Sequence, residues 1–359
     1  MGPSTQHLMV DLSDLHSTES LASLSRAARI IKSGGIVAFP TETVYGLGAN
    51  ALNEAAVARI FEAKQRPAWD PLIVHVSDEE MLLQVARGIS ACARSLMDAF
   101  WPAPLTLLVP KHPDLHPIVT AGRPRVGVRM PAHPVAIELL RTAGVPIAAP
   151  SANLFGHVSP TSASHVLDDL NGRIDAVLDG GETQHGLEST VVDTCETPAI
   201  VYRPGVISLE QIAAVCGPAD AFDMQNGAGS MNSPGMALRH YAPRARLILI
   251  EGEGAAQHSA FYKAVAKARQ DGGTVGLMLP VEFDRRSSTR LEPRSGLIYQ
   301  WGRLAAPDEL AHRLFAGLRQ LDAAGAKTIV CPLPPAIGLG VAIRDRLRRA
   351  AAHQNPHRS

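Results

Sequence analysis

Apolar residues recur at helical spacing over about residues 17–32, and two glycines then end this segment before the apolar run IVAF. The pattern predicts a helix, a turn and a strand. Asn53 is placed to cap a second helix that runs to about Lys64, and two prolines separate it from the β-branched run LIVHV. The chain is therefore expected to open with alternating helices and strands.

The same reading extends over the first 210 residues. Short apolar runs predict further strands at LTLLV, VGV, VPIAA, DAVL, STVVD and AIVY. Helical spacing recurs near 78–100, 133–143, 162–170 and 208–216. We therefore expect one α/β unit with a large, twisted mixed sheet in this part of the chain.

Between residues 217 and 243 the composition changes to Gly, Pro, Ser and Asn, which prevents a sustained apolar period and predicts a linker. Beyond it, the runs LILI, VGLML, GLIYQW and TIVCP alternate with helical segments near 255–270, 307–322 and 339–351. Such alternation is typical of a three-layer α/β domain with a mostly parallel sheet. The expected domains are 1–216 and 244–359, joined by the linker 217–243.

Composition supports two globular domains and excludes some functions. Of the 359 residues, 46% are hydrophobic and 19% charged, which leaves each half enough apolar material for a core. Lys and Arg together number 34, as do Asp and Glu, so no overall positive field would hold nucleic acid or an anionic membrane. A site for a polyanion must therefore be local.

The cysteines and the N-terminal residues bear on the compartment. Cys92, Cys195, Cys216 and Cys331 stand far apart without a CxxC pair, which predicts neither a zinc ribbon nor a disulfide framework. The first residues lack a basic region followed by an apolar core, and no stretch approaches the roughly 20 apolar residues of a membrane span. We therefore expect a cytoplasmic protein in a reducing compartment.

Common catalytic motifs are missing from the sequence. It contains no GxxxxGK[ST], no HExxH and no GxSxG, and the nearest approach to GxGxxG, at residues 46–51, lacks the third glycine. Nucleotide binding would therefore use another kind of site.

The first string that indicates chemistry is PTETVYGLGANA, which follows an apolar strand at residue 40. Thr41, Glu42, Thr43 and Tyr45 precede a glycine-rich turn, so hydroxyls and backbone N–H groups could contact a small polar ligand. An ordinary strand-to-helix loop is the alternative.

Cations and a histidine follow in AKQRPAWDPLIVHV. Lys64 and Arg66 come at a helix end, where they could bind an anion or simply pair with the helix dipole. His75 lies on the strand LIVHV, where a hydrogen-bonded structural role is the alternative to catalysis.

Further donors gather where other strands begin or end. In RVGVRMP, Arg125 and Arg129 are four residues apart and share one face of a strand. Later strings add more hydroxyl, amide and cationic side chains: Ser151, Asn153, Ser159, Thr161, Ser189, Thr190 and Arg203, and in the linker Ser233, Arg239, His240 and Tyr241. Lys64, Arg66, Arg129 and Arg203 together suit a triphosphate or a carboxylate, with chemistry by positioning and charge stabilisation.

These strings resemble the threonylcarbamoyl-adenylate synthase family in its two-domain form, which has a YrdC-like catalytic domain and a Rossmann-like C-terminal domain. The matching strings are FPTETVYGLGANA, AKQRP, PLIVHV, VRMPAHP, PSAN, ESTVVD, RPG, SPGMALRHYAP and GLGVAIRDRLRRAA. They stand in family order over roughly residues 25–350. The resemblance implies a nucleotidyltransferase that joins L-threonine, bicarbonate or carbon dioxide, and ATP into threonylcarbamoyl-AMP and releases pyrophosphate.

The resemblance also implies partners and contacts. Mg²⁺ would accompany ATP, and the product would pass to a separate complex that modifies adenosine in tRNA. L-threonine would be held by Thr43, His75, Arg129 and Ser189. ATP would contact Lys64, Arg66, Asp70, Ser151, Asn153, Ser159 and Arg203, with Ser233 and His240 of the linker covering it as a lid; Lys64 and Arg66 would act on the transition state.

The sequence departs locally from the family pattern. Asp70 stands where asparagine is common, Arg125 stands where threonine is usual, and no lysine follows SPGM. Two other functions stay open: a carbamoyl-transfer enzyme of the hydrogenase-maturation type, and a double-stranded RNA-binding module. The first usually carries acylphosphatase and zinc-finger regions that are not visible here, and the zero net charge weakens the second.

Overall fold

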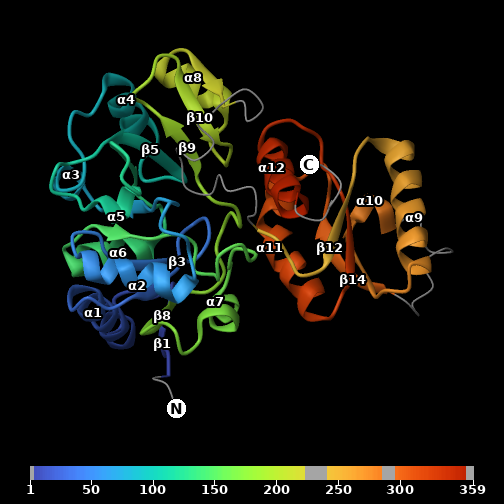
Figure 1. Ribbon diagram of the computed structural model, residues 1–359, viewed down its shortest axis with the longest axis horizontal. Coiled ribbons are helices and arrows are strands. Elements are labelled where there is room, and N and C mark those ends of the chain that lie inside the picture. Colours follow the sequence, from blue (N-terminus) through green and yellow to red (C-terminus); the bar gives the residue numbers. More distant parts are fainter. Residues whose placement is uncertain (1–3, 223–240, 285–295, 353–359) are drawn as a thin grey trace. The chain divides into compact units, whose positions relative to one another are not determined.

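The computed structural model describes residues 4–222, 241–284 and 296–352, which form two compact units (Figure 1). The first unit holds most of the chain up to residue 222. The second holds 241–352 together with the short segments 156–158 and 185–187. The segment 223–240 of the predicted linker lies outside the described residues.

The first unit is built on an eleven-stranded sheet that mixes parallel and antiparallel pairs, as predicted. The strands LIVHV and RVGVR run parallel and adjacent, whereas IVAF pairs antiparallel with the strand that follows it. In sheet order the strands are β1 (Gln6–Met9), β8 (Ala176–Asp179), β2 (Val37–Phe39), β3 (Gly46–Asn50), β7 (Ile147–Ala148), β4 (Ile73–His75), β6 (Arg125–Arg129), β5 (Leu105–Pro110), β9 (Thr190–Asp193), β10 (Ala199–Arg203) and β11 (Ala219–Ala221).

Helices cover this sheet and bury its apolar side chains in one large core (Figure 1). Ser17 and Asn53 cap the first two long helices by accepting hydrogen bonds from Ser20 N and Ala56 N, and the cap at Asn53 was predicted. The helices of this unit are α1 (Thr18–Lys32), α2 (Glu54–Lys64), α3 (Glu79–Leu83), α4 (Ala91–Phe100), α5 (Pro117–Thr120), α6 (Pro134–Ala143), α7 (Ala163–Leu170) and α8 (Leu209–Cys216).

The helical pattern near 78–100 is divided into two helices, α3 and α4. α3 ends at Leu83 with Gln84 as its C-cap, and Gly88 adopts φ +60° in the connection before α4, a conformation that glycine adopts at little cost. Ser90 then starts α4 by accepting a hydrogen bond from Ala93 N. Periodicity alone did not reveal this break.

The expected glycine-rich turn after Tyr45 is instead strand β3, which pairs with β2 and β7. A Cβ on Gly48 would lie 2.7 Å from side-chain atoms of both Phe39 and Ile147. Glycine is therefore required there for close strand packing rather than for turn flexibility. The run PTETVY consequently joins two strands and is not a strand-to-helix loop.

The second unit is a three-layer α/β domain with a four-stranded parallel sheet, as predicted. Helices α11 and α12 cover one face of the sheet, and α9 and α10 cover the other (Figure 1). In sheet order its strands are β12 (Arg246–Ile250), β15 (Thr328–Pro332), β13 (Val275–Pro280) and β14 (Gly296–Gly302); its helices are α9 (Gly254–Gln270), α10 (Val281–Asp284), α11 (Pro307–Ala323) and α12 (Leu339–Ala351). Among the helices described in both units, none has the length and apolar character needed to span a membrane.

Candidate active site

The loop after β2 is tied by backbone hydrogen bonds to the segment that follows β7. Tyr45 N donates to Pro160 O at 2.9 Å, and Ala152 N donates to Tyr45 O at 2.8 Å. The string PTETVY therefore meets PSAN and SPT, which come much later in the sequence. Tyr45 itself is buried, and its hydroxyl donates to Gly181 O at 2.7 Å, so it holds the loop in place.

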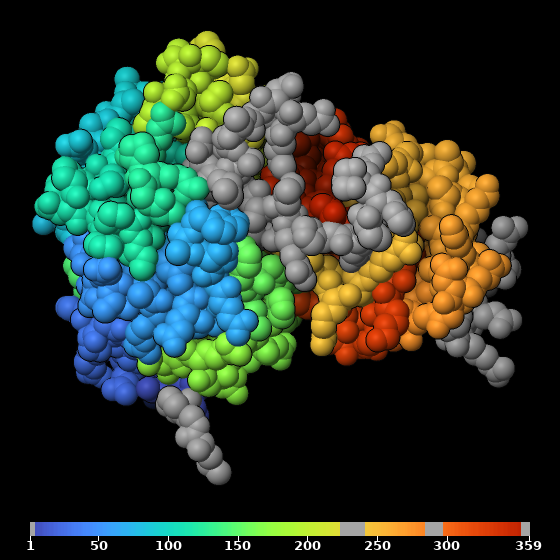
Figure 2. Space-filling view, in the orientation of Figure 1, coloured from blue at the N-terminus to red at the C-terminus, as the bar shows by residue number. Residues whose placement is uncertain are grey.

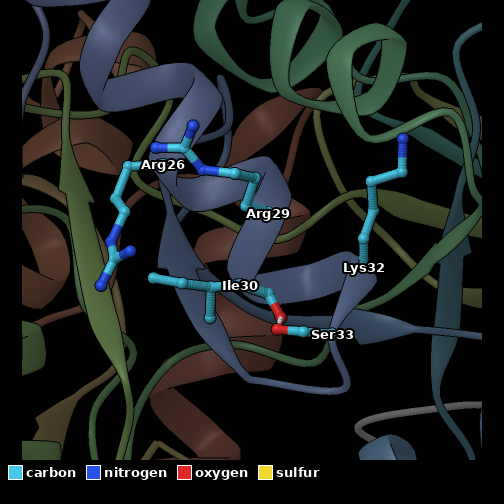
Figure 3. Close-up of a pocket in the computed structure, with 5 residues that line it drawn as sticks. All are labelled: Arg26, Arg29, Ile30, Lys32 and Ser33. Atoms are coloured by element: carbon cyan, nitrogen blue, oxygen red, sulfur yellow. Dashed lines mark hydrogen bonds between the residues drawn. The ribbon is translucent and has the colours of Figure 1, made fainter.

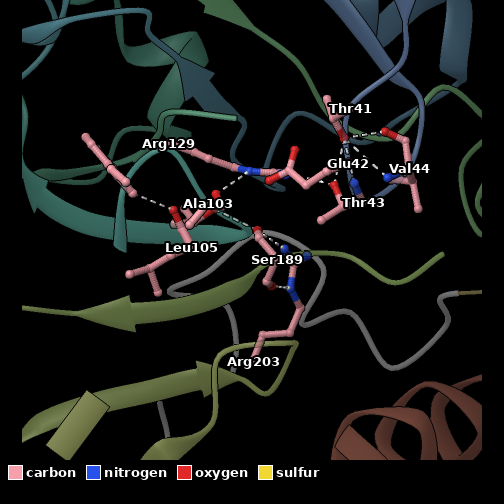
Figure 4. Close-up of polar contacts among 11 residues, drawn as sticks. Thr41, Glu42, Thr43, Val44, Ala103, Leu105, Arg129, Ser189 and Arg203 are labelled. Carbon is pink, nitrogen blue, oxygen red and sulfur yellow. Dashed lines mark hydrogen bonds and ion pairs between the residues drawn. The ribbon is translucent and has the colours of Figure 1, made fainter. Parts of the chain in front are cut away.

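Arg129, at the end of β6, reaches into this loop. Its Nη1 donates to Thr43 Oγ1 at 2.9 Å, and its Nη2 lies 2.6 Å from Glu42 Oε1 (Figure 4). Arg129 is only 4% exposed, and a buried arginine needs such a counter-ion. The structure thus unites Arg129 with Thr43 and adds Glu42, which no predicted contact included.

His75 occupies the neighbouring strand β4 in register with Arg129. Burial, reinforced by the charge of Arg129, lowers the pKa of His75 to about 3, so its imidazole is neutral at physiological pH. Its Nδ1 has no hydrogen-bond partner among the described residues. A histidine with a purely structural role would have both ring nitrogens hydrogen-bonded, and the described residues do not provide this for Nδ1 of His75.

Ser189 precedes β9 and is held from two sides. Its hydroxyl lies 2.8 Å from Thr106 Oγ1, and it accepts a hydrogen bond from Arg203 Nη2 at 3.0 Å (Figure 4). Arg203 Nε also donates to Ser189 O at 2.9 Å. Gly205, two residues after Arg203, packs against the backbone at Ser189 and Thr190. A Cβ on Gly205 would lie only 2.5 Å from Thr190 N.

Lys64 ends α2, yet it does not serve the carbonyls of its own helix. Its buried ammonium group donates to the main-chain carbonyls of Ser151 and Asn153. Burial lowers the pKa of Lys64, and the nearby Arg66 lowers it further. Ser151 Oγ in turn donates to Asn153 Oδ1 at 2.5 Å, so these three predicted residues form one cluster.

Arg66 and Asp70 belong to the same cluster. Their side chains are 3% and 2% exposed and form an ion pair with Nη2 and Oδ2 2.9 Å apart. Arg66 Nη2 also donates to Pro71 O at 2.9 Å. Figure 2 shows the light-blue surface that contains residues 60–70 bordering green segments that come much later in the chain.

The remaining predicted nucleotide contacts have different outcomes. Ser159 Oγ donates to Glu188 Oε1 at 2.5 Å. Glu188 directly precedes Ser189 in the sequence. Ser233 and His240 lie outside the described residues, as does most of the predicted lid. Arg125, which was not a predicted contact, pairs with Asp193 and Glu196 and, within the described part of the chain, forms no hydrogen bond or ion pair with Arg129, Thr43 or Glu42.

The predicted contacts left out three residues of this site: Glu42, Thr106 and Glu188. Glu42 was named in the string PTETVY but was given no partner, and Glu188 stood unremarked in ESTVVD. Thr106 was hidden in the apolar run LTLLV, where a single polar residue on a buried strand gave only a weak signal.

Other charged features lie apart from this group. A pocket beside the last turn of α1 is lined by Arg26, Arg29, Ile30, Lys32 and Ser33 (Figure 3). Two of its cations, Arg29 and Lys32, stand in the last turn of the helix, where the dipole favours them. Across the part of the chain that the structure describes, His, Cys, Asp and Glu side chains form no group of three suited to a metal ion.

The fold and the candidate site together define a two-domain α/β protein whose first unit gathers buried cations and hydroxyls. Residues 29–205 match a family model of Sua5, YciO and YrdC proteins described as telomere recombination, and residues 207–352 match the model for the threonylcarbamoyl-AMP synthase C-terminal domain. The chain belongs to the threonylcarbamoyl-AMP synthase family.

Individual relatives are similar over nearly the whole chain. The threonylcarbamoyl-AMP synthase of Bacillus subtilis is 42% identical over 352 residues, covering 97% of this chain and 98% of the relative. That of Pyrococcus abyssi is 42% identical over 330 residues, covering 91% and 94%. The crystal structure of P. abyssi Sua5 complexed with L-threonine is 40% identical, covers 98% of each chain and has a TM-score of 0.88. The match to both domain models favours the synthase over the two alternatives left open by the sequence.

Proposed function

We propose that this enzyme joins L-threonine, carbon dioxide derived from bicarbonate, and ATP into threonylcarbamoyl-AMP and pyrophosphate. The observation that carries the proposal is the buried group of Arg129, Thr43 and Glu42, beside a neutral His75. This group offers a cation for a carboxylate and polar atoms for an amine and a hydroxyl. The related P. abyssi protein has been crystallised with L-threonine, which supports this reading.

L-threonine would bind with its carboxylate on Arg129 and its hydroxyl near Thr43 and His75. A guanidinium has five N–H groups, and among the described residues the contacts with Thr43, Glu42 and Ala103 O account for three. With respect to those residues, two N–H groups would be left for a carboxylate. Ser189, held by Thr106 and Arg203, would complete the threonine site.

ATP would bind over the cluster of Lys64, Arg66, Ser151 and Asn153, with Arg203 and Ser159 nearby. Lys64 and Arg66 would offset the charge that builds up as the carbamate oxygen attacks the α-phosphorus and pyrophosphate departs. Phosphate charge beside Lys64 would favour its protonated form and oppose the effect of burial on its pKa. Since the threonine and phosphate groups are tied through the loops at 40–45 and 150–160, both substrates would be aligned in one site.

Mg²⁺ would enter with ATP and be held mainly by its phosphates. No described cluster of carboxylates would bind it independently, and Asp70 is already paired with Arg66. Bound there, the ion would neutralise charge on the outer phosphates. The product would serve a separate transferase that modifies adenosine in tRNA.

Omitting each substrate in turn tests the reaction. With labelled bicarbonate, L-threonine and MgATP, the label should enter an AMP-containing product only when all three are present. Pyrophosphate release should then depend on L-threonine. Equal release without any amino acid would reject the proposed reaction.

A further inference from the structure

Glu42 is a buried carboxylate with one oxygen unused. Its side chain is only 2% exposed; Oε1 forms the ion pair with Arg129, and Oε2 has no hydrogen-bond partner among the described residues. A buried carboxylate oxygen without a donor costs free energy, since water would have provided hydrogen bonds to it. Its burial is explained if a ligand supplies the missing donor.

The surroundings indicate the chemistry of that donor. Arg129 provides a positive charge and Glu42 provides a negative charge, and both come from the same ion pair. His75, in register with Arg129, adds the unpartnered Nδ1 of a neutral imidazole. A zwitterion with a hydroxyl group matches all three: a carboxylate for Arg129, an ammonium group for Glu42 and a hydroxyl for His75.

We propose that Glu42 Oε2 accepts a hydrogen bond from the α-ammonium group of the amino-acid substrate, and that Glu42 thereby selects α-amino acids over acids without the amine. This inference rests on the proposed function and adds a specificity-determining residue to the threonine site. Glu42 would also orient the nitrogen that must later bond to carbon dioxide. A role for Glu42 only as the counter-ion of Arg129 is the alternative.

Calorimetric titration with two ligands separates these roles. L-threonine and (R)-3-hydroxybutanoate share the carboxylate and the hydroxyl, but the second lacks the amine. The wild-type protein should bind L-threonine more tightly by on the order of 10²-fold, the range for a buried charge pair that loses one partner. In Glu42→Gln this preference should fall to within a few fold, because threonine binding weakens while hydroxybutanoate binding is retained.

Each outcome bears on the inference. Equal weakening of both ligands in Glu42→Gln would overturn it and leave Glu42 as a counter-ion of Arg129. Equal binding of both ligands by the wild-type protein would also overturn it, even if the variant failed to fold. If the wild-type protein bound no L-threonine, the proposed function would fail as well. Glu62→Gln, an exposed change on α2, is the matched control and should keep the wild-type preference.

Discussion

Arg66 and Asp70 form a buried ion pair in which Nη2 and Oδ2 lie 2.9 Å apart. Asp70 thus sets a carboxylate against a cation proposed to act on ATP. The pair explains how this negative charge is tolerated close to the proposed phosphate site. A nucleotide bound there would share Arg66 with an internal partner.

Replacing Asp70→Asn should reveal that competition. Removing one partner of a buried pair costs about 3–5 kcal/mol, because the remaining charge loses its compensation. Bound phosphates would restore that compensation at Arg66, so the drop in the thermal unfolding midpoint should shrink in the presence of MgATP. Asp98→Asn, an exposed change on α4, should show no such nucleotide dependence. If the unfolding midpoint fell equally with and without MgATP, Asp70 would not be part of the nucleotide site.

Lys64→Ala and Arg66→Ala test whether these cations act in the reaction. Each should lower kcat by on the order of 10²-fold or more if its charge stabilises the transition state. Lys32→Ala removes a cation from the last turn of α1 and is the control for a purely helix-terminal role. If either site variant kept wild-type turnover, the replaced residue would have no role in the reaction and would only pair with the helix dipole.

Arg129→Lys keeps the charge but removes the planar fork that can hold a carboxylate at two points. We expect the KM for L-threonine to rise on the order of tenfold or more, with a smaller effect on the KM for ATP. Steady-state kinetics with each substrate varied in turn measures both values. An equal rise in both would show that the change disturbs the whole site and not the threonine contact.

Folding stability should fall in acid partly because of His75. Its pKa is about 3 in the folded protein, against 6.5 for an ordinary histidine, so below pH 6.5 the unfolded chain binds a proton that the folded protein excludes. The free energy of unfolding should therefore lose about 2 kcal/mol from this residue between pH 6.5 and pH 5. Urea unfolding of His75→Gln should show a shallower loss over that range, whereas His16→Gln, a change at an exposed histidine, should match the wild-type slope. Identical slopes in all three proteins would contradict the assigned burial of a neutral imidazole.

Gly205→Ala should disturb Ser189 through the backbone. The new Cβ would lie 2.5 Å from Thr190 N and 2.9 Å from Ser189 C, so the strand beginning at Thr190 must shift. Overpacking of this kind costs about 1–3 kcal/mol of stability. Titration with L-threonine should show weaker binding. An unchanged affinity for L-threonine would mean that Ser189 does not contact it.

Much of the fold could be predicted because local signals agreed with the final packing. The first helix starts near Ser17 and Asn53 caps the second, as predicted, and the runs LIVHV and TIVCP contain strands. β3 was not predictable, because its glycines are set by the contact of Gly48 with Phe39 and Ile147, residues on neighbouring strands. Local patterns contain no record of such close approaches.

The site was predictable to the same limit. Polar strings at strand and helix ends nominated Thr43, Arg129 and Lys64, but did not show which side chain each would meet. Glu42 became informative only when its pairing with Arg129 left one buried oxygen unsatisfied. That property belongs to a three-dimensional arrangement, and spacing along the chain does not encode it.

A crystal structure of this protein with L-threonine and a non-hydrolysable ATP analogue tests the central claim most directly. The account predicts the threonine carboxylate on Arg129, its ammonium group on Glu42, and the phosphates beside Lys64 and Arg66. Either ligand bound elsewhere, with these side chains left in their present contacts, would contradict it.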